Sequence, residues 1–346
     1  MSLATDFERV SLPLENAFTI ARGTQETAEN VVVRIEDEDG TEGIGAAAPS
    51  AHYGETADTV EAVLPDLLET VEDVGDPHQL DRIERRMAET VERNPAARCA
   101  VSVALHDLAA KRADLPLYRY WGLDPEEAVS TSYTIGIDST ERMAEKTETA
   151  VERGYSTLKV KVGTDRDEEI VSTVRDHAPD ATIRVDANEA WSPREAVRKI
   201  DRLAAYDLEF VEQPVPAADP EGLKFVRDRS ALPIAADESC VTLPDVPQIA
   251  DKADIANLKL MKCGGLREAK RMIHTARAHG LEVMLGCMIE TNAAISAAAH
   301  LAPLLDYADL DGSLLLDDDP YDGVAMPEGD IDLAGLDRVG TGVRRE

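Results

Sequence analysis

Residues 182–214 of the 346-residue chain read TIRVDANEAWSPREAVRKIDRLAAYDLEFVEQP. The β-like run Thr182–Asp186 precedes a helical pattern, Pro193–Tyr206, and a second β-like run, Glu209–Glu212. A strand, a helix and a strand in this order form a βαβ unit, whose two strands lie parallel in one sheet. The stretch therefore predicts an α/β fold.

The same unit repeats from about residue 130 onward. Its β-like runs follow one another at intervals of about 25 residues, with helical patterns such as Glu141–Arg153 and Leu266–His279 between them. Eight runs alternating with about seven helices predict a parallel (β/α)8 barrel. A doubly wound open sheet is the alternative, but no GxGxxG turn follows any run. The other runs are Ser132–Ile137, Thr157–Val162, Pro233–Asp237, Ile255–Leu260, Glu282–Gly286 and Tyr307–Leu310.

The first 125 residues have a different pattern. Asn30–Ile35 and Thr41–Ala48 are apolar runs joined through Asp39-Gly40, which is a strong turn signal between two strands. Three helical patterns follow, at roughly Thr56–Val74, His78–Arg93 and Ala96–Ala113. A chain of this length suggests either two domains or one large α/β unit. We expect an α+β capping domain over 1–125, the barrel over 126–312, and a tail over 313–346 that returns to the capping domain.

Composition restricts the class of function. The chain has 68 Asp and Glu against 36 Lys and Arg, which gives a formal net charge of −32. Proteins that bind nucleic acid or anionic membranes need basic surfaces, so we expect neither partner. No signal peptide and no membrane-spanning apolar run is visible, which favours a cytoplasmic protein. Four scattered cysteines argue against a disulfide framework or a zinc site.

Lysine is scarce, with only ten residues in the chain. Few lysines and many acidic residues are typical of proteins from a high-salt cytoplasm, where salt screens the repulsion between like charges. An acidic enzyme from an ordinary, low-salt source is the alternative. Four of the ten lysines lie in the apolar segments Leu158–Val162 and Leu258–Lys262. Surface chemistry does not explain that placement.

Three carboxylates end consecutive β-like runs: Asp186, Glu212 and Asp237. In a barrel the active site lies at these strand ends, and neighbouring strands are under about 5 Å apart. A buried acidic cluster needs a cation, and all-oxygen ligation suits Mg²⁺, one ion per subunit. The alternative is that these are ordinary acidic residues of an acidic chain.

Lys159 and Lys161 are two residues apart on one run and so face the same side. If that side is the barrel interior, mutual repulsion and burial should lower a lysine pKa and produce a base. Lys259, on the sixth run, would approach from across the barrel. Two opposed lysines can remove and return an α-proton while a metal stabilises the enediolate. Alternatively, both lysines of the first pair point outward, where the helices would bury them unpaired.

Five motifs at the strand ends together carry a family resemblance. They are Lys159-x-Lys161, Asp186-x-Asn188, Glu212-Gln-Pro, Asp237-Glu238-Ser and Lys259-x-x-Lys262-x-Gly-Gly. This set resembles the enolase superfamily, muconate-lactonizing subgroup, over nearly the whole chain. The resemblance implies a modified, enolase-like (β/α)8 barrel with an N-terminal capping domain.

The resemblance also implies the role of each site residue. It implies Mg²⁺ on the three strand-end carboxylates, with Lys161 and Lys259 as the two acid/base catalysts. Lys159 would polarise the substrate carboxylate. Three further residues would support the site from positions beside these groups: Asn188, Glu238 and Lys262.

Asp309 and Asp311, at the eighth run, face one way and can receive a substrate α-ammonium group. The pair resembles the Asp-x-Asp of dipeptide epimerases, although an acidic turn is the alternative. Arg22 lies in a stretch that resembles the family's mobile specificity loop, as in L-Ala-D/L-Glu epimerases. There it would bind an acidic substrate side chain or remain a plain loop charge. Thr134 is a further candidate for contact with the substrate carboxylate.

The leading hypothesis is a Mg²⁺-dependent epimerase that inverts an α-carbon of a dipeptide by two-lysine 1,1-proton transfer through a metal-stabilised enediolate. A muconate-type cycloisomerase, an N-acylamino-acid racemase and an o-succinylbenzoate synthase are alternatives, because all share the enolate step. A non-catalytic binding or storage protein on the same barrel is a further alternative, against which the intact lysine pair argues. The expected partners are a small dipeptide or related carboxylate and, in a homo-oligomer, further copies of the chain.

Overall fold

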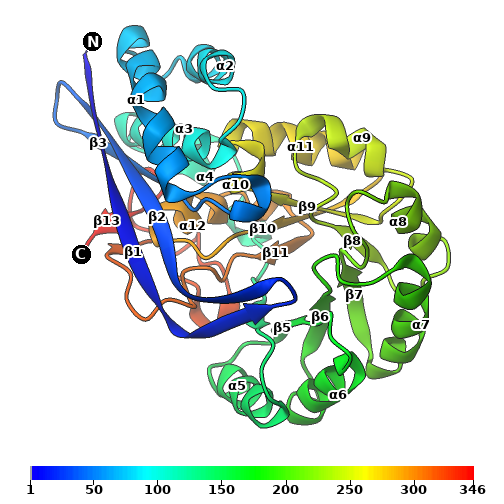
Figure 1. Ribbon diagram of the computed structural model, residues 1–346. Coiled ribbons are helices and arrows are strands. Elements are labelled where there is room, and N and C mark those ends of the chain that lie inside the picture. The colour runs from blue at the N-terminus through cyan, green and yellow to red at the C-terminus, as the bar shows by residue number, and fades with distance from the viewer. Residues whose placement is uncertain (1) are drawn as a thin grey trace.

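The computed structural model describes residues 2–346 and consists of a barrel and an α+β part that covers one end of it (Figure 1). Eight parallel strands pair in chain order, and a bridge between Thr131 and Ala308 links the last strand to the start of the first. The sheet is therefore nearly closed, which confirms the barrel and excludes the open sheet. The strands are β4 (Tyr133–Ile135), β5 (Thr157–Lys161), β6 (Thr182–Asp186), β7 (Leu208–Glu212), β8 (Ile234–Ala236), β9 (Ile255–Lys259), β10 (Glu282–Gly286) and β11 (Tyr307–Asp309).

Helices follow each barrel strand up to β10 and cover the outside of the barrel (Figure 1). No α-helix follows β11 in the described chain, because residues beyond it turn back to the α+β part. The helices are α5 (Thr140–Glu152), α6 (Asp167–His177), α7 (Pro193–Leu203), α8 (Pro220–Arg227), α9 (Val246–Ile249), α10 (Leu260–Cys263), α11 (Leu266–Ala278) and α12 (Asn292–Ala299).

Strand alternation decides which side chains enter the barrel. In β5, Leu158 and Val160 belong to the main apolar core, whereas Lys159 and Lys161 point to the acidic interior and pair with carboxylates there. At the opposite end the interior is closed by Arg184, whose Nε donates to Glu209 and whose guanidinium lies over the ring of Phe210. Lys159, Lys161 and the carboxylates that they pair with thus lie at the carboxyl end of the barrel.

The α+β part contains an antiparallel sheet, β1 (Leu3–Ile20), β2 (Gly23–Asp37) and β3 (Glu42–Ala47). Helix α3 (Pro95–Arg112) is buried between this sheet and the barrel helices. A Cβ atom at Gly43 would lie 2.1 Å from the Ala104 carbonyl oxygen, so glycine allows this close approach. The other helices of this part are α1 (Ala57–Val74), α2 (Leu80–Thr90) and α4 (Leu117–Tyr120), with the short 3₁₀ turn η1 (Ala51–Tyr53).

The sequence predicts no strand before Asn30, whereas the structure contains the 18-residue strand β1. Only Leu3 and Leu12 of this strand are buried, and its apolar residues change phase between Phe7 and Val10, so no single alternating run reveals it. Its hydrogen-bonded register with β2 stabilises it instead. The predicted turn at Asp39-Gly40 is confirmed, since the Asp37 N–H donates to Thr41 across it.

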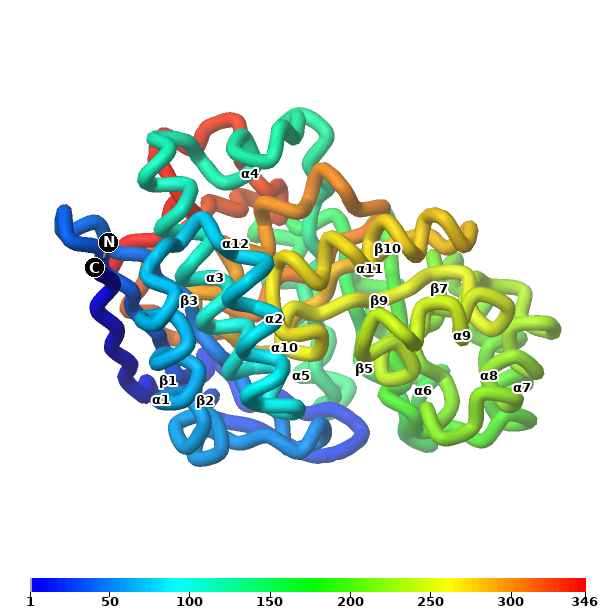
Figure 2. The backbone as a smooth tube through the Cα atoms, turned by 90° about the horizontal axis from the view of Figure 1, so that it is seen from above, coloured from blue at the N-terminus to red at the C-terminus, as the bar shows by residue number. Residues whose placement is uncertain are grey.

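The C-terminal residues run back along the α+β part (Figure 2). Leu316 forms a bridge with Leu14 of β1, and the Leu117 N–H donates to the Gly340 carbonyl oxygen. The strand pair β12 (Tyr321–Asp322) and β13 (Arg344–Arg345) ends the chain beside Glu8. The tail therefore completes the capping part, as the fold prediction states.

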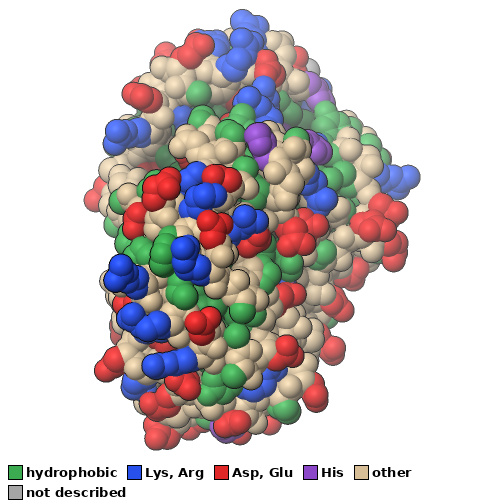
Figure 3. All heavy atoms as spheres, turned by 90° about the vertical axis from the view of Figure 1, so that its right-hand side faces the viewer, with side chains coloured by type: hydrophobic (Ala, Val, Ile, Leu, Met, Phe, Trp, Pro, Cys, Tyr) green, Lys and Arg blue, Asp and Glu red, His purple; other side chains and the backbone are tan. Residues whose placement is uncertain are grey.

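Acidic and basic side chains are interspersed over the face that carries α7 and α8, with only scattered apolar groups (Figure 3). Across residues 2–346, no helix has both the length and the apolar character needed to cross a bilayer.

Candidate active site

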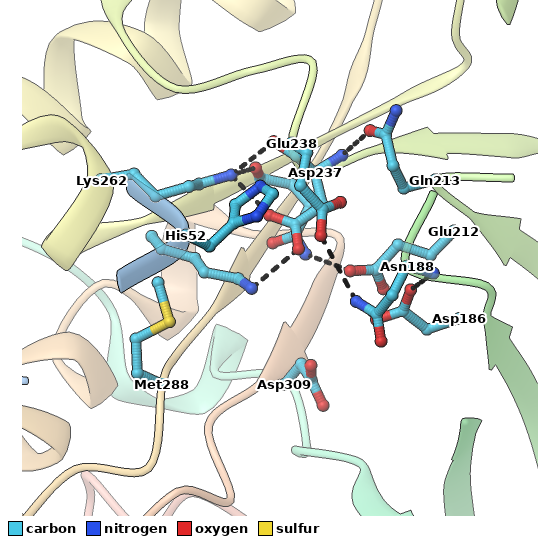
Figure 4. Close-up of polar contacts among 12 residues, drawn as sticks. His52, Asp186, Asn188, Glu212, Gln213, Asp237, Glu238, Lys262, Met288 and Asp309 are labelled. Atoms are coloured by element: carbon cyan, nitrogen blue, oxygen red, sulfur yellow. Dashed lines mark hydrogen bonds and ion pairs between the residues drawn. The ribbon is translucent and has the colours of Figure 1, made fainter. Parts of the chain in front are cut away.

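The carboxyl ends of β6, β7 and β8 bring three carboxylates together. Asp186 and Glu212 are register partners at the last positions of β6 and β7, and Asp237 follows β8. One oxygen of each lies within 4.8 Å of the other two, and all three residues are fully buried. Figure 4 shows these carboxylates facing a common space at the barrel mouth.

The electrostatics of this cluster fit a divalent cation. Burial and the charge of Asp186 raise the pKa of Glu212 to about 8. Its Oε2 atom lies 2.9 Å from Lys159 Nζ but accepts no well-directed hydrogen bond. Burial opposes ionisation of Asp186 too, but Lys161 and Lys159 outweigh it and lower the pKa to about 2. Three oxygen donors with an unsatisfied buried atom among them suit Mg²⁺.

The three predicted lysines all enter this cluster. Lys161 Nζ on β5 donates to Asp186 at 2.7 Å, and Lys259 Nζ on β9 donates to Asp237 at 2.8 Å. Because β5 and β9 lie on either side of β6–β8, these two ammonium groups flank the carboxylates. Lys159 Nζ lies between the cluster and Asp309, to which it donates at 2.6 Å.

Of the pair for which a lowered lysine pKa was predicted, the prediction is wrong for Lys159. Burial acts in the predicted direction on Lys159, but the charges of Asp309, Glu212 and Asp186 outweigh it and raise its pKa well above the usual range. The pKa of Lys259 is likewise raised, because Asp237 outweighs burial. The error arose because repulsion between the lysines was considered without the carboxylates paired to them.

Two of the three residues predicted to support the site, Asn188 and Lys262, contact its carboxylates, and the third, Glu238, contacts Asn188. Lys262, in α10, donates to the side chain of Asp237 at 2.6 Å and to its carbonyl oxygen at 2.7 Å (Figure 4). Asn188 donates from its side chain to Asp186 at 3.2 Å and to Glu238 at 3.4 Å. Asn188 has a φ of 44°, which is a left-handed backbone conformation. The hydrogen bonds of its side chain help to stabilise this conformation.

Two supporting residues were missed. The side-chain oxygen of Gln213 accepts the backbone N–H groups of Asp237 and Ser239, which fixes the loop after β8. Asn257 donates to Glu212 at 2.8 Å. The available signal for Asn257 was its position two residues before Lys259 on the same strand face.

Asp309 and Asp311 lie at the end of β11, on the other side of the barrel mouth. Asp309 accepts from Ser132 Oγ at 2.6 Å as well as from Lys159, and Asp311 accepts from the Thr134 N–H at 2.6 Å. Burial and the charge of Asp309 raise the pKa of Asp311 to about 7. The two carboxylates and Thr134 line the same cavity.

That cavity has a volume of about 630 Å³ and extends from the barrel mouth to the capping part. The turn of the β1–β2 hairpin and η1 form its cover. Arg22 also lines it, but its guanidinium pairs with Glu238 at 2.8 Å and Glu189 at 3.3 Å. The apolar and aromatic lining comprises Phe18, Ile20, Ala28, Ala48, Pro49, Ala51, Tyr53, Met288, Ile289 and Leu315.

The arrangement suits a small carboxylate with a cationic group at its other end. A carboxylate would meet Lys159 and a cation held by the acidic cluster, and an ammonium group would meet Asp309 and Asp311. An α-carbon between them would lie within the space flanked by Lys161 and Lys259. Proton removal at such a carbon is the chemistry that this geometry supports.

Two family models match the chain and together cover most of it. The model described as enolase C-terminal domain-like matches residues 142–344. The model described as mandelate racemase / muconate lactonizing enzyme, N-terminal domain, matches residues 5–122.

Curated relatives and solved structures agree with these matches. The chain is 39% identical to an L-Ala-D/L-Glu epimerase of Bacteroides thetaiotaomicron, over 95% of this chain and 85% of that protein. It is 40% identical to a hydrophobic dipeptide epimerase of Enterococcus faecalis, over 90% of each. A dipeptide epimerase from Enterococcus faecalis, solved with Mg and the dipeptide L-Leu-L-Tyr, superposes with a TM-score of 0.91 and 37% identity over the full length of both chains. The chain therefore belongs to the mandelate racemase / muconate lactonizing enzyme family of the enolase superfamily.

Proposed function

We propose that this isomerase is a Mg²⁺-dependent dipeptide epimerase that inverts the α-carbon next to the free carboxylate by two-lysine 1,1-proton transfer. One observation supports this above the others: Lys161 and Lys259 flank the carboxylate cluster from β5 and β9, while two further carboxylates lie opposite on β11. The names of the relatives point the same way.

Asp186, Glu212 and Asp237 would hold one Mg²⁺ per chain, because they form one cluster. When bound, the ion supplies positive charge that stabilises the anion left by proton removal. Lys159 would add a second positive charge at the substrate carboxylate, since its Nζ lies between the cluster and Asp309. Buried charges of this kind act strongly because water does not screen them.

Lys161 and Lys259 would exchange protons with opposite faces of the α-carbon. In one direction Lys161 Nζ, in its neutral form, takes the proton and Lys259 Nζ returns another. In the reverse direction Lys259 must be neutral, which a cation held beside Asp237 would favour by offsetting the carboxylate charge that raises the pKa of Lys259. Asp186 and Asp237 hold the two Nζ atoms in place. An inversion needs this pairing, because a single base returns its proton to the face from which it came.

Asp309 and Asp311 would bind the free α-ammonium group of the dipeptide, with Thr134 holding Asp311. This pair favours a dipeptide over the alternatives. Muconate, N-acylamino acids and succinylbenzoate precursors carry no α-ammonium group, so two buried carboxylates would repel them.

Four further proposals rest on the sequence alone. They are a cytoplasmic location, a homo-oligomeric state, a surface adapted to high salt, and the division into residues 1–125, 126–312 and 313–346.

Incubation of the protein with a dipeptide library in D₂O with Mg²⁺ tests the function. We expect mass shifts of one unit in a subset of dipeptides, together with the appearance of the second diastereomer. Muconate and N-acylamino acids serve as competing substrates. Lack of exchange with every dipeptide, or faster turnover of muconate, would contradict the proposal.

A further inference from the structure

The β1–β2 hairpin reaches over the barrel mouth, where its turn lies between Ile20 and Gly23 (Figure 1). The Ile137 N–H, just after β4, donates to the Thr19 carbonyl oxygen at 2.8 Å and attaches one side of the hairpin. The register of β1 with β2 shifts between Pro13 and Phe18, so the end of the hairpin is not a simple continuation of the sheet. Contacts with the barrel must therefore help to position it.

Arg22 makes those contacts at the turn. Its Nη2 atom lies 2.8 Å from Glu238 Oε1, and its Nη1 atom donates to the Asn188 carbonyl oxygen at 3.1 Å and faces Glu189 at 3.3 Å. Glu238 follows β8 and the other two residues follow β6. One guanidinium thus connects the hairpin to two loops of the barrel mouth.

The structure holds Glu189 in place for this contact. Its φ is 70°, a left-handed conformation that is unfavourable for a residue with a side chain. Its Oε1 atom accepts the Ala217 N–H at 2.8 Å, which leaves Oε2 directed at Arg22 and His52. A strained backbone at this position is consistent with a required side-chain role.

The same contacts remove Arg22 as a receptor for an acidic substrate. A guanidinium that already has two carboxylate partners, one of them only 1% exposed, gains little from a third. The other cations that line the cavity, Lys159, Lys161 and Lys259, each pair with a carboxylate of the reaction centre. An acidic side chain under the hairpin would therefore find no Lys or Arg in the cavity lining that lacks a carboxylate partner.

The hairpin covers the carboxylate end of the substrate. The partners of Arg22 follow β6 and β8, the strands whose ends carry metal-binding carboxylates, whereas the ammonium-binding pair lies across the mouth on β11. The hairpin lines the cavity with the apolar Phe18 and Ile20 as well as with polar residues of its turn, and Met288 and Ile289 after β10 add further apolar surface. An apolar side chain buried there gains about 25 cal/mol per Å².

We infer that Arg22 is a positioning residue, which fastens the β1–β2 hairpin to the barrel mouth through Glu189 and Glu238. The residue of the dipeptide that bears the free carboxylate accordingly has an uncharged, apolar side chain. The part of this inference that concerns the substrate rests on the proposed function. The part that concerns the contact between Arg22 and the barrel mouth does not.

The test compares L-Ala-L-Xaa dipeptides, with Leu, Phe, Glu or Lys as Xaa, in the wild type and in variants of Arg22. We expect the kcat/KM of wild-type exchange to be at least tenfold higher for Leu and Phe than for Glu and Lys. Arg22→Met should lower kcat/KM for every substrate by a similar factor, mainly through KM, and Arg22→Lys should restore part of it. Arg9→Met, on strand β1 of the same hairpin, is the matched control, because Arg9 pairs with Asp58 and Glu61 of the capping part and its replacement should leave the rates unchanged.

Glu189→Gln provides a second test of the fastening contact. It should lower kcat/KM, as Arg22→Met does. The double variant should have a kcat/KM no lower than that of the poorer single variant, because both changes remove the same contact between Arg22 and Glu189. Additive losses would contradict the contact.

Two outcomes separate this inference from the proposed function. If the wild type prefers L-Ala-L-Glu and Arg22→Met loses only that substrate, Arg22 reads the substrate and the inference is wrong while the epimerase function stands. If no dipeptide exchanges its α-proton, the proposed function fails. Hydrogen exchange of the protein's backbone amides then still tests the contact between Arg22 and the barrel mouth. Arg22→Met should then increase deuterium uptake in residues 18–25, and unchanged uptake would overturn it.

Discussion

Lys161 and Asp186 are register partners on the neighbouring strands β5 and β6, and Lys161 Nζ donates to Asp186 Oδ2 at 2.7 Å. On the other side of the cluster Lys259 Nζ likewise donates to Asp237 Oδ2 at 2.8 Å, although Asp237 lies beyond the paired residues of β8. Each proposed acid/base lysine is therefore positioned by a proposed metal ligand. Proton transfer and metal binding depend on the same buried charges. A substitution at one of these lysines is therefore expected to affect its partner carboxylate as well, and the reverse.

Substitution of either Lys161 or Lys259 should stop α-proton exchange from only one face of the dipeptide α-carbon. Lys161→Ala should lower α-proton exchange by at least a hundredfold for one diastereomer of the dipeptide, and Lys259→Ala should do so for the other. Epimerisation should be lost in both variants. ¹H NMR of each pure diastereomer in D₂O measures the two exchange rates separately. Equal loss for both diastereomers in one variant would argue against two opposed bases.

The Glu212→Gln variant should lose Mg²⁺ binding while the metal-free protein keeps its stability. Without metal, Gln removes a buried acid whose pKa is raised to about 8, so the thermal midpoint should stay equal or rise. In the wild type, Mg²⁺ at a hundred times its Kd should add about 2.7 kcal/mol of stability, and the variant should lose this response. Differential scanning fluorimetry across a Mg²⁺ titration measures both effects. A variant that keeps the full Mg²⁺ response would exclude Glu212 as a ligand.

Asp311→Asn tests the ammonium site. The change removes one of two carboxylates near the substrate α-ammonium and should raise KM for a free dipeptide at least tenfold, because charge-assisted hydrogen bonds are lost. An N-acetylated dipeptide has no ammonium group and serves as the control. It should be a poor substrate for the wild type and no worse for the variant. An equal loss for both substrates would point to general damage instead.

The residues at the barrel strand ends could be predicted from sequence because spacing and strand alternation place them with little dependence on the rest of the chain. Asp186 and Glu212 end predicted runs whose last residues are also the last residues of β6 and β7, and alternation alone directs Lys159 and Lys161 to one side. The barrel itself followed from the repeat of about 25 residues.

Long-range contacts could not be predicted in this way. The pairing of Arg22 with Glu189 and Glu238 joins residues more than 160 positions apart, and their meeting depends on how the capping part lies on the barrel. The raised lysine pKa values have the same origin, because partner carboxylates on other strands determine them. Strand β1 was missed since its stability comes from its neighbour, not from its own pattern.

His300 should make the protein sensitive to acid. It is fully buried and its Nδ1 accepts the Tyr118 N–H at 3.0 Å, so burial lowers its pKa to about 4. An unfolded chain binds this proton near pH 6.5, so stability is complete above that pH and falls as the pH decreases towards 4. The loss is on the order of 3 kcal/mol. Denaturant unfolding of the wild type and His300→Asn from pH 7 to 4.5 measures it, and parallel curves would rule it out.

Salt should stabilise the chain if its surface is adapted to high salt. At a net charge of −32 the folded state repels itself, and the Debye length falls from about 10 Å at 0.1 M salt to about 3 Å at 1 M. The thermal midpoint should therefore rise between 0.1 and 2 M KCl. Exposed ion pairs weaken under the same conditions, but each contributes less than about 1 kcal/mol.

A charge-reduced variant separates this effect from general salting-out. Lysine in place of three exposed acidic residues, Glu38, Glu89 and Asp201, would change the net charge from −32 to −26 without touching the core. Its midpoint in 0.1 M KCl should be higher than that of the wild type, and its gain between 0.1 and 2 M should be smaller. Salting-out acts on apolar surface and is the same in both proteins. Identical salt responses would therefore assign the stabilisation to salting-out and leave the acidic surface without a role in it.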